Sequence, residues 1–174
     1  MLEGWHDFFV LLGTAAAALV ALLFVAVSVG VGFLSFESAA GTRMYMSPVV
    51  VHFTGVLFAC AAGLVPGLGA VSCAWLFGAG AASGIIYSVI IAVPILRNPA
   101  TDLDDKICHG VVPPISYVLG LIAAVLFYRG SPAAPDVLAV TFVVLLAGNI
   151  RNAWDLVLFM ARKQTEVQRH ANDT

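Results

Sequence analysis

Charged residues are scarce in this sequence. They make up 10% of its 174 residues, whereas hydrophobic residues make up 61%. Soluble domains carry about 25% charged and about 45–50% apolar residues. A soluble fold of this composition cannot cover its surface with polar groups, so we expect lipid to surround its apolar faces. The net charge of -2 offers no basic surface, and no nucleic-acid partner is expected.

Cysteine is also rare, and the motifs of common enzyme families are missing. Three cysteines without a Cys-x-x-Cys pair provide neither a disulfide framework nor a zinc signature. The sequence contains no GxSxG, HExxH, phosphate-loop or dinucleotide fingerprint. We therefore expect no enzymatic activity, no catalytic residue, no cofactor and no metal.

One acidic segment is open to two interpretations. Asp102, Asp104 and Asp105 lie in the predicted loop 97–111, and three carboxylates can bind a divalent cation. Thr101 and Asp104, however, have the spacing of a helix capping box, which places acidic residues in a first helical turn. We favour the helix start.

Long apolar runs dominate the chain instead. A spanning helix needs about 20 apolar residues. A strand interpretation fails because the apolar runs are too long and show no alternation, and irregular backbone cannot face lipid. The first run starts almost at the N-terminus and is too long for a signal peptide, so we expect it to be retained. The sequence predicts an all-α, single transmembrane domain over residues 1–174, with five transmembrane helices at about 8–36, 48–64, 70–96, 112–128 and 135–160. Pro48 suits the first turn of the second helix.

The basic residues between and after these helices are unevenly distributed. With five spans, one side of the membrane carries only Arg129. The other side carries six basic residues: Arg43, Arg97, Lys106, Arg162, Lys163 and Arg169. Cytoplasmic loops are enriched in Lys and Arg. The distribution therefore predicts an N-terminus outside and a C-terminus in the cytoplasm.

Polar residues interrupt the last apolar run. Arg151 lies inside this run, and ionisable residues in spans usually face a protein interior or water. Asp155 is four residues away and can pair with Arg151 along the helix. We predict a polar layer in the cytoplasmic half, lining or gating a path for an ion or small solute, formed by His52, Tyr117, Asn149, Arg151, Asn152 and Asp155. The alternative is that Arg151 extends to cytoplasmic phosphates while Asp155 neutralises it.

His52 and Tyr117 occupy equivalent positions in a weak internal repeat. Segments 48–59 and 113–124 align at an offset of 65 residues, and Pro, Gly and Ala recur in both. Both segments would enter the membrane from the cytoplasm, which predicts a parallel repeat. Chance matching of apolar sequences is the alternative.

The third predicted span is rich in small residues. The spacing of Gly78, Gly80, Ala82 and Gly84 allows helix backbones to approach closely. This pattern predicts either an oligomer seam or ordinary helix packing within one chain. With the polar layer, it favours a homo-oligomeric membrane channel or small transporter. The alternative is a non-transporting accessory or scaffolding subunit that binds another membrane protein.

The N-terminal segment carries a resemblance. Trp5-His6-Asp7-Phe8-Phe9-Val10, followed by residues 13–17 and 22–28, resembles the opening of uncharacterised small bacterial integral membrane proteins. The resemblance covers about the first 28 residues. It implies a location in the bacterial cytoplasmic membrane, the cell inner membrane, and it carries no activity.

Overall fold

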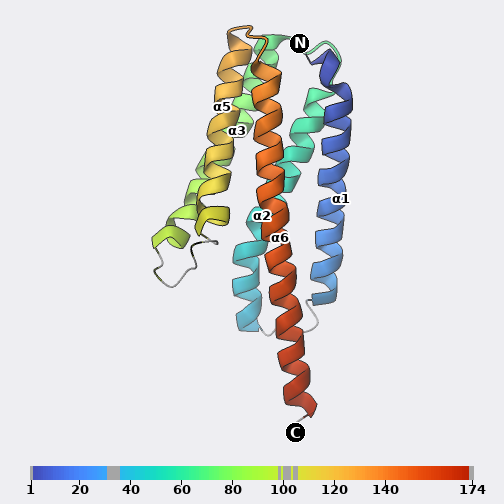
Figure 1. Cartoon of the computed structure of the whole chain (residues 1–174), viewed down its shortest axis with the longest axis vertical. Helices are drawn as coiled ribbons and strands as arrows, with labels where there is room; N and C mark the ends of the chain where they lie inside the picture. Colours follow the sequence, from blue (N-terminus) through green and yellow to red (C-terminus); the bar gives the residue numbers. More distant parts are fainter. Residues whose placement is uncertain (1, 31–35, 98, 100–102, 104–105, 173–174) are drawn as a thin grey trace.

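The computed structural model describes residues 2–30, 36–97, 99, 103 and 106–172. These residues form helices and turns and no β-strand, which confirms the predicted all-α fold for this part of the chain. A short 3-10 helix precedes the first α-helix, and a π-helix, η3, leads directly into α5 (Figure 1). The helices are η1 Glu3–Trp5, α1 His6–Gly30, α2 Phe36–Gly63, α3 Ala70–Arg97, η3 Lys106–Val111, α5 Val112–Tyr128 and α6 Ala134–Asn172.

Within the described part of the chain, four helical segments are long and apolar enough to cross a membrane. They are Glu3–Ala26, Ala70–Arg97, Lys106–Tyr128 and Ala134–Asp155. The apolar part of α2, Pro48–Gly63, is shorter. Their length and composition are compatible with a multi-pass membrane protein.

The helices form two pairs that α6 joins. Successive helices run up and down the long axis of the molecule (Figure 1). α1 packs mainly against α2, and α3 packs mainly against α5, whereas α6 contacts α5, α2 and α1. α2 and α3 follow each other in the chain but contact each other sparingly. The two pairs therefore stay apart along one side of α6.

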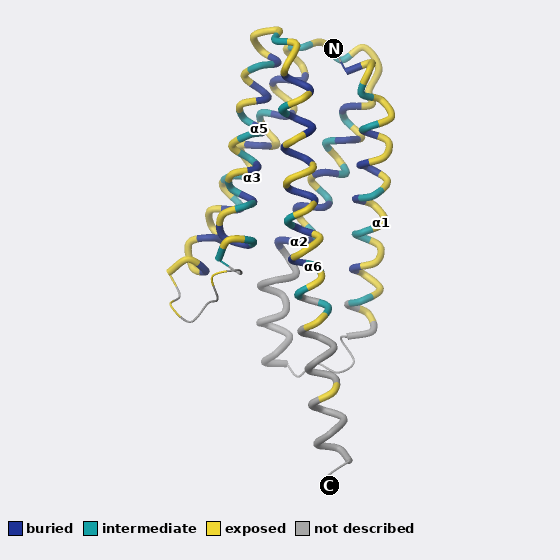
Figure 2. Tube along the Cα trace, viewed as in Figure 1, coloured by how far each residue is buried: buried dark blue, intermediate teal, exposed yellow. Residues whose placement is uncertain are grey.

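Apolar side chains form the core and also cover much of the outer surface. Large apolar side chains such as Leu11, Phe58 and Trp75 are exposed, whereas His52 and Asn149 are buried. Where burial is described, exposed and buried positions alternate along the helices, so these parts have an inner face (Figure 2). Lipid solvates apolar side chains, and polar groups in spans turn inward. The pattern is the one that a hydrocarbon solvent requires.

Three helix boundaries differ from the prediction. α1 ends at Gly30, and Phe36 already belongs to α2, whereas a single span was predicted over 8–36. Glycine lowers helix propensity by about 1 kcal/mol relative to Ala, and Gly30 is followed by a second glycine at 32. Residues 31–35 lie outside the described part of the chain.

α2 and α6 are both longer than predicted. α2 begins before Pro48, so this proline lies inside the helix rather than in its first turn. α6 continues to Asn172, whereas its predicted end was at 160. Both extensions are rich in Ala, Met, Arg, Glu or Gln, which favour helix without requiring an apolar environment. Hydropathy therefore marks the membrane segments but not the helix ends.

Candidate functional site

His52 and Tyr117 form the centre of a buried polar layer. His52 on α2 and Tyr117 on α5 share a hydrogen bond of 2.7 Å between Nδ1 and Oη. Tyr87 on α3 adds a third ring, whose centroid lies 5.9 Å from that of His52. The two residues at equivalent positions of the predicted repeat thus contact each other directly. Three helices meet at this point.

Gly84 on α3 makes room for the Tyr117 ring. A Cβ atom at Gly84 would overlap that ring, so only glycine fits at this position. Gly78 faces α5 too, and a Cβ there would lie 3.3 Å from the Cβ of Ala124. Gly78 and Gly84 therefore pack within the chain.

The other two small residues of α3 lie elsewhere. Nothing lies within 4 Å of a Cβ placed on Gly80, and Ala82 is exposed. The predicted small-residue seam is therefore divided. Gly78 and Gly84 pack against α5. Gly80 borders open space, and Ala82 lies on the outer surface.

Asn149 and Asn152 supply the polar groups of α6. They lie one turn apart on its inner face and are 1% and 3% exposed. Asn149 donates its Nδ2 hydrogen to the carbonyl of Leu145 at 2.7 Å. Asn152 donates its own to the carbonyl of Cys108, in η3, at 3.3 Å. Within the described residues, neither Oδ1 atom has a hydrogen-bond partner.

Local sequence brings α5 and η3 close to this face of α6. A Cβ on Gly148 would lie only 2.8 Å from Cγ1 of Val112, so the absence of a side chain lets the helices meet. The π-helical turn Lys106–Val111 presents the Cys108 carbonyl toward α6, and such turns recur at functional sites. Leaving a buried acceptor unsatisfied costs about 1–3 kcal/mol. Two such acceptors lie one helical turn apart on α6.

Arg151 and Asp155 lie on a more exposed side of α6. Nε of Arg151 is 3.8 Å from Oδ2 of Asp155, the pairing expected from their spacing, and the two side chains are 53% and 40% exposed. The indole of Trp154 beside them is exposed as well. The six predicted site residues are therefore divided. His52, Tyr117, Asn149 and Asn152 form the inner layer, and Arg151 and Asp155 form an outer pair.

Two members of the layer were not among the predicted site residues. Tyr87 interrupts an apolar run of α3, and that interruption was the available signal. His109 is buried in η3, whereas the sequence placed it in a loop. Its signal was the apolar residues on both sides, Ile107 and Val111–Val112.

The acidic segment predicted as a helix start or cation site lies outside the described residues at Thr101, Asp102, Asp104 and Asp105. Among residues that the structure describes, no three His, Cys, Asp or Glu side chains converge on a metal position.

Fold and site together define a helical bundle with apolar outer faces and a buried polar layer. The chain matches no protein-family model, no curated protein and no solved structure. The chemistry of the layer is therefore the ground on which a function is argued.

Proposed function

We propose that this protein is a small membrane transporter whose polar layer binds a small neutral solute with N–H or O–H donors. The observation that carries the proposal is the pair of buried Oδ1 atoms of Asn149 and Asn152, which lack partners in the described chain. A solute that donates hydrogen bonds to both atoms recovers the free energy lost by burying them. Urea, simple amides and small polyols have this chemistry.

The groups around the site favour a neutral solute over an ion. The layer consists of amide, imidazole, phenol and backbone carbonyl groups, and the Arg151–Asp155 pair lies on the outer face. A buried charge without a compensating partner is far more costly than a buried neutral group. A donor-rich neutral molecule meets the two acceptors without that penalty.

We propose five membrane spans, with the short apolar segment Pro48–Gly63 as the fifth. The excess of basic residues on one side supports an N-terminus outside and a C-terminus in the cytoplasm. The polar layer then lies in the cytoplasmic half of a bacterial cytoplasmic membrane. We also propose a homo-oligomer, because five helices form a thin bundle and the exposed Ala82 leaves a small-residue surface for a second copy.

Solute entry into proteoliposomes tests the transport proposal. We expect wild-type protein to accelerate urea entry, measured by stopped-flow light scattering, over protein-free liposomes. Tetramethylurea, which has the carbonyl but no N–H donor, should show no acceleration. Asn152→Leu should abolish the acceleration, whereas Arg151→Gln, at the same depth on the outer face, should preserve it. Equal entry of urea, formamide and glycerol with and without protein would contradict the proposal.

An accessory subunit is the second candidate function. α6 continues from the candidate span Ala134–Asp155 to Asn172, so a helix extends beyond the apolar segment. Such an extension can dock on another protein. Stoichiometric co-purification of one membrane protein, lost on truncation after residue 158, would favour this function over transport.

A further inference from the structure

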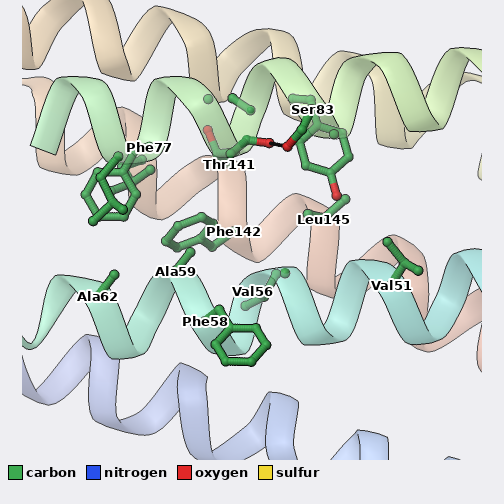
Figure 3. Close-up of a pocket in the computed structure, with 18 of the residues that line it drawn as sticks. Val51, Val56, Phe58, Ala59, Ala62, Phe77, Ser83, Thr141, Phe142 and Leu145 are labelled. Carbon is green, nitrogen blue, oxygen red and sulfur yellow. Dashed lines mark hydrogen bonds between the residues drawn. The ribbon is translucent and has the colours of Figure 1, made fainter.

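A pocket of about 440 Å³ lies between the two helix pairs. Figure 3 shows Val51, Val56 and Ala62 of α2 on one wall and Phe77 and Ser83 of α3 on the other. α6 closes the pocket between these walls with Phe142 and Leu145. The pocket forms because α2 and α3 contact each other only sparingly.

The mouth of the pocket is apolar and lies at membrane depth. Val51, Phe58 and Leu76 line the pocket and are also exposed. They belong to the apolar segment Pro48–Gly63 of α2 and to the candidate span Ala70–Arg97. In a bilayer, molecules reach this opening from the lipid phase.

The size of the pocket selects among possible occupants. Its lining on α3 extends from Leu76 to Tyr87, a length of about 16 Å at 1.5 Å per residue. Its volume of about 440 Å³ over this length makes the pocket long and narrow, the shape of a single hydrocarbon chain.

Polar groups gather at one end of this pocket. α2 and α3 are antiparallel, so Val51, Tyr87 and Tyr117 lie at one end and Ala62 and Leu76 at the other.

Farther along the pocket, the hydroxyl groups are engaged within their own helices. Ser83 donates to the carbonyl of Gly80 at 2.9 Å, and Thr141 donates to the carbonyl of Val137 at 2.8 Å. The pocket is apolar along most of its length and has phenol groups at one end. This arrangement complements a hydrocarbon chain with one small head group.

We propose that this pocket binds a neutral, single-headed lipophilic molecule, such as a long-chain alcohol, with its head group at Tyr87 and Tyr117. The head group is neutral because the pocket lining contains no charged residue among the described positions. Asn149 and Asn152 do not line the pocket. Tyr87 and Tyr117 belong to both sites, whereas Asn152→Leu alters only the solute site and Gly80→Leu only the pocket, so these two variants distinguish a failure of solute uptake from a failure of chain binding.

The test uses the full chain in phosphatidylcholine nanodiscs and a diazirine derivative of dodecanol as the probe. Photolabelling, mapped by mass spectrometry, should fall on α2 and α3 lining residues, and excess dodecanol should suppress it. Excess dodecane, which lacks the head group, should suppress it less. Tyr87→Phe should remove this difference between the two competitors.

A matched pair of variants separates the pocket from the general lipid surface. Gly80→Leu should abolish labelling, because Gly80 lines the pocket and its Cβ position is open. Ala82→Leu, on the same helix but outside the lining, should leave labelling unchanged. Ser83→Leu, at an exposed lining position, replaces Gly80→Leu if that variant does not fold. Undiminished labelling in the filled pocket, or equal competition by dodecane, would identify an adventitious lipid only and overturn the proposal.

Discussion

The two faces of α6 place polar side chains in opposite surroundings. Asn149 and Asn152 are buried among α5, η3 and the inner layer, whereas Arg151 and Asp155 pair on the outside. These residues occupy less than two turns of one helix. The two sets therefore lie at a similar depth in the membrane. They differ in their position around the helix axis.

The two sets differ in whether their polar groups have partners. Arg151 and Asp155 pair with each other, and both side chains are exposed. The inner amides donate their hydrogens to carbonyls and keep two acceptors without partners in the described chain. The unsatisfied acceptors belong to the inner face, whereas the outer face carries the formal charges.

The largest effect on stability is expected at Gly84, against which the Tyr117 ring of the inner layer packs. Gly84→Val should displace the Tyr117 ring, because a Cβ at this position overlaps it. Overpacking costs about 1–3 kcal/mol and occasionally more, and we expect the upper end of this range. The free energy of unfolding, measured by denaturant titration in micelles, checks the loss. Ala82→Val is the matched control, and a similar loss there would show that Tyr117 is not the cause.

Asn149→Leu should raise stability while abolishing urea entry. Leu branches at the same carbon as Asn, although it is larger, and it removes the buried acceptor, whose burial without a partner costs about 1–3 kcal/mol. Unfolding titration and stopped-flow scattering on the same preparation measure both changes. A destabilised variant with normal urea entry would mean that Asn149 is a structural residue and not a binding group.

Tyr117→Phe should have a moderate effect on stability. It removes the hydroxyl that lies 2.7 Å from Nδ1 of His52 and leaves the ring in its seat. Hydrogen bonds between membrane helices contribute about 0.6 kcal/mol on average and up to about 1.7 kcal/mol. Tyr128→Phe, exposed on the same helix, is the control. If His52→Ala and Tyr117→Phe are fully additive in a double-mutant cycle, the hydrogen bond contributes nothing.

Arg151→Gln should have the smallest effect. Exposed ion pairs contribute about 0–1 kcal/mol, so unfolding and urea entry should both stay near wild type. Asp155→Asn, alone and combined with Arg151→Gln, measures the coupling energy of the pair. A large loss of urea entry in Arg151→Gln alone would move the functional surface to the outer face and reverse the comparison.

Hydropathy predicted where most of the apolar helices lie in the sequence. It could not predict which face of each helix points inward. The predicted limits of α3 and α5, 70–96 and 112–128, agree with the structure to within one residue, because apolar runs and turn residues mark them in sequence. Arg151 and Asn152 are neighbours in sequence but differ by about 100° around α6. Which of them faces inward depends on packing against α5 and η3.

The partner of each small residue was unpredictable for the same reason. Gly84 is part of a local motif, but its contact is Tyr117, on another helix. The depth of the polar layer could be counted from the span ends, and this count brought His52 and Tyr117 to one level. Their hydrogen bond depends in addition on the tilt and spacing of α2 and α5, which no single segment encodes.

α6 is one continuous helix from Ala134 to Asn172. Its 39 residues form a rod about 58 Å long at 1.5 Å per residue, and it has no proline beyond its first turn. Because this helix is continuous, a rotation about its axis would move Asn149 and Asn152 together. A rotation of about 100° would bring Arg151 to the position around the axis that Asn152 now occupies.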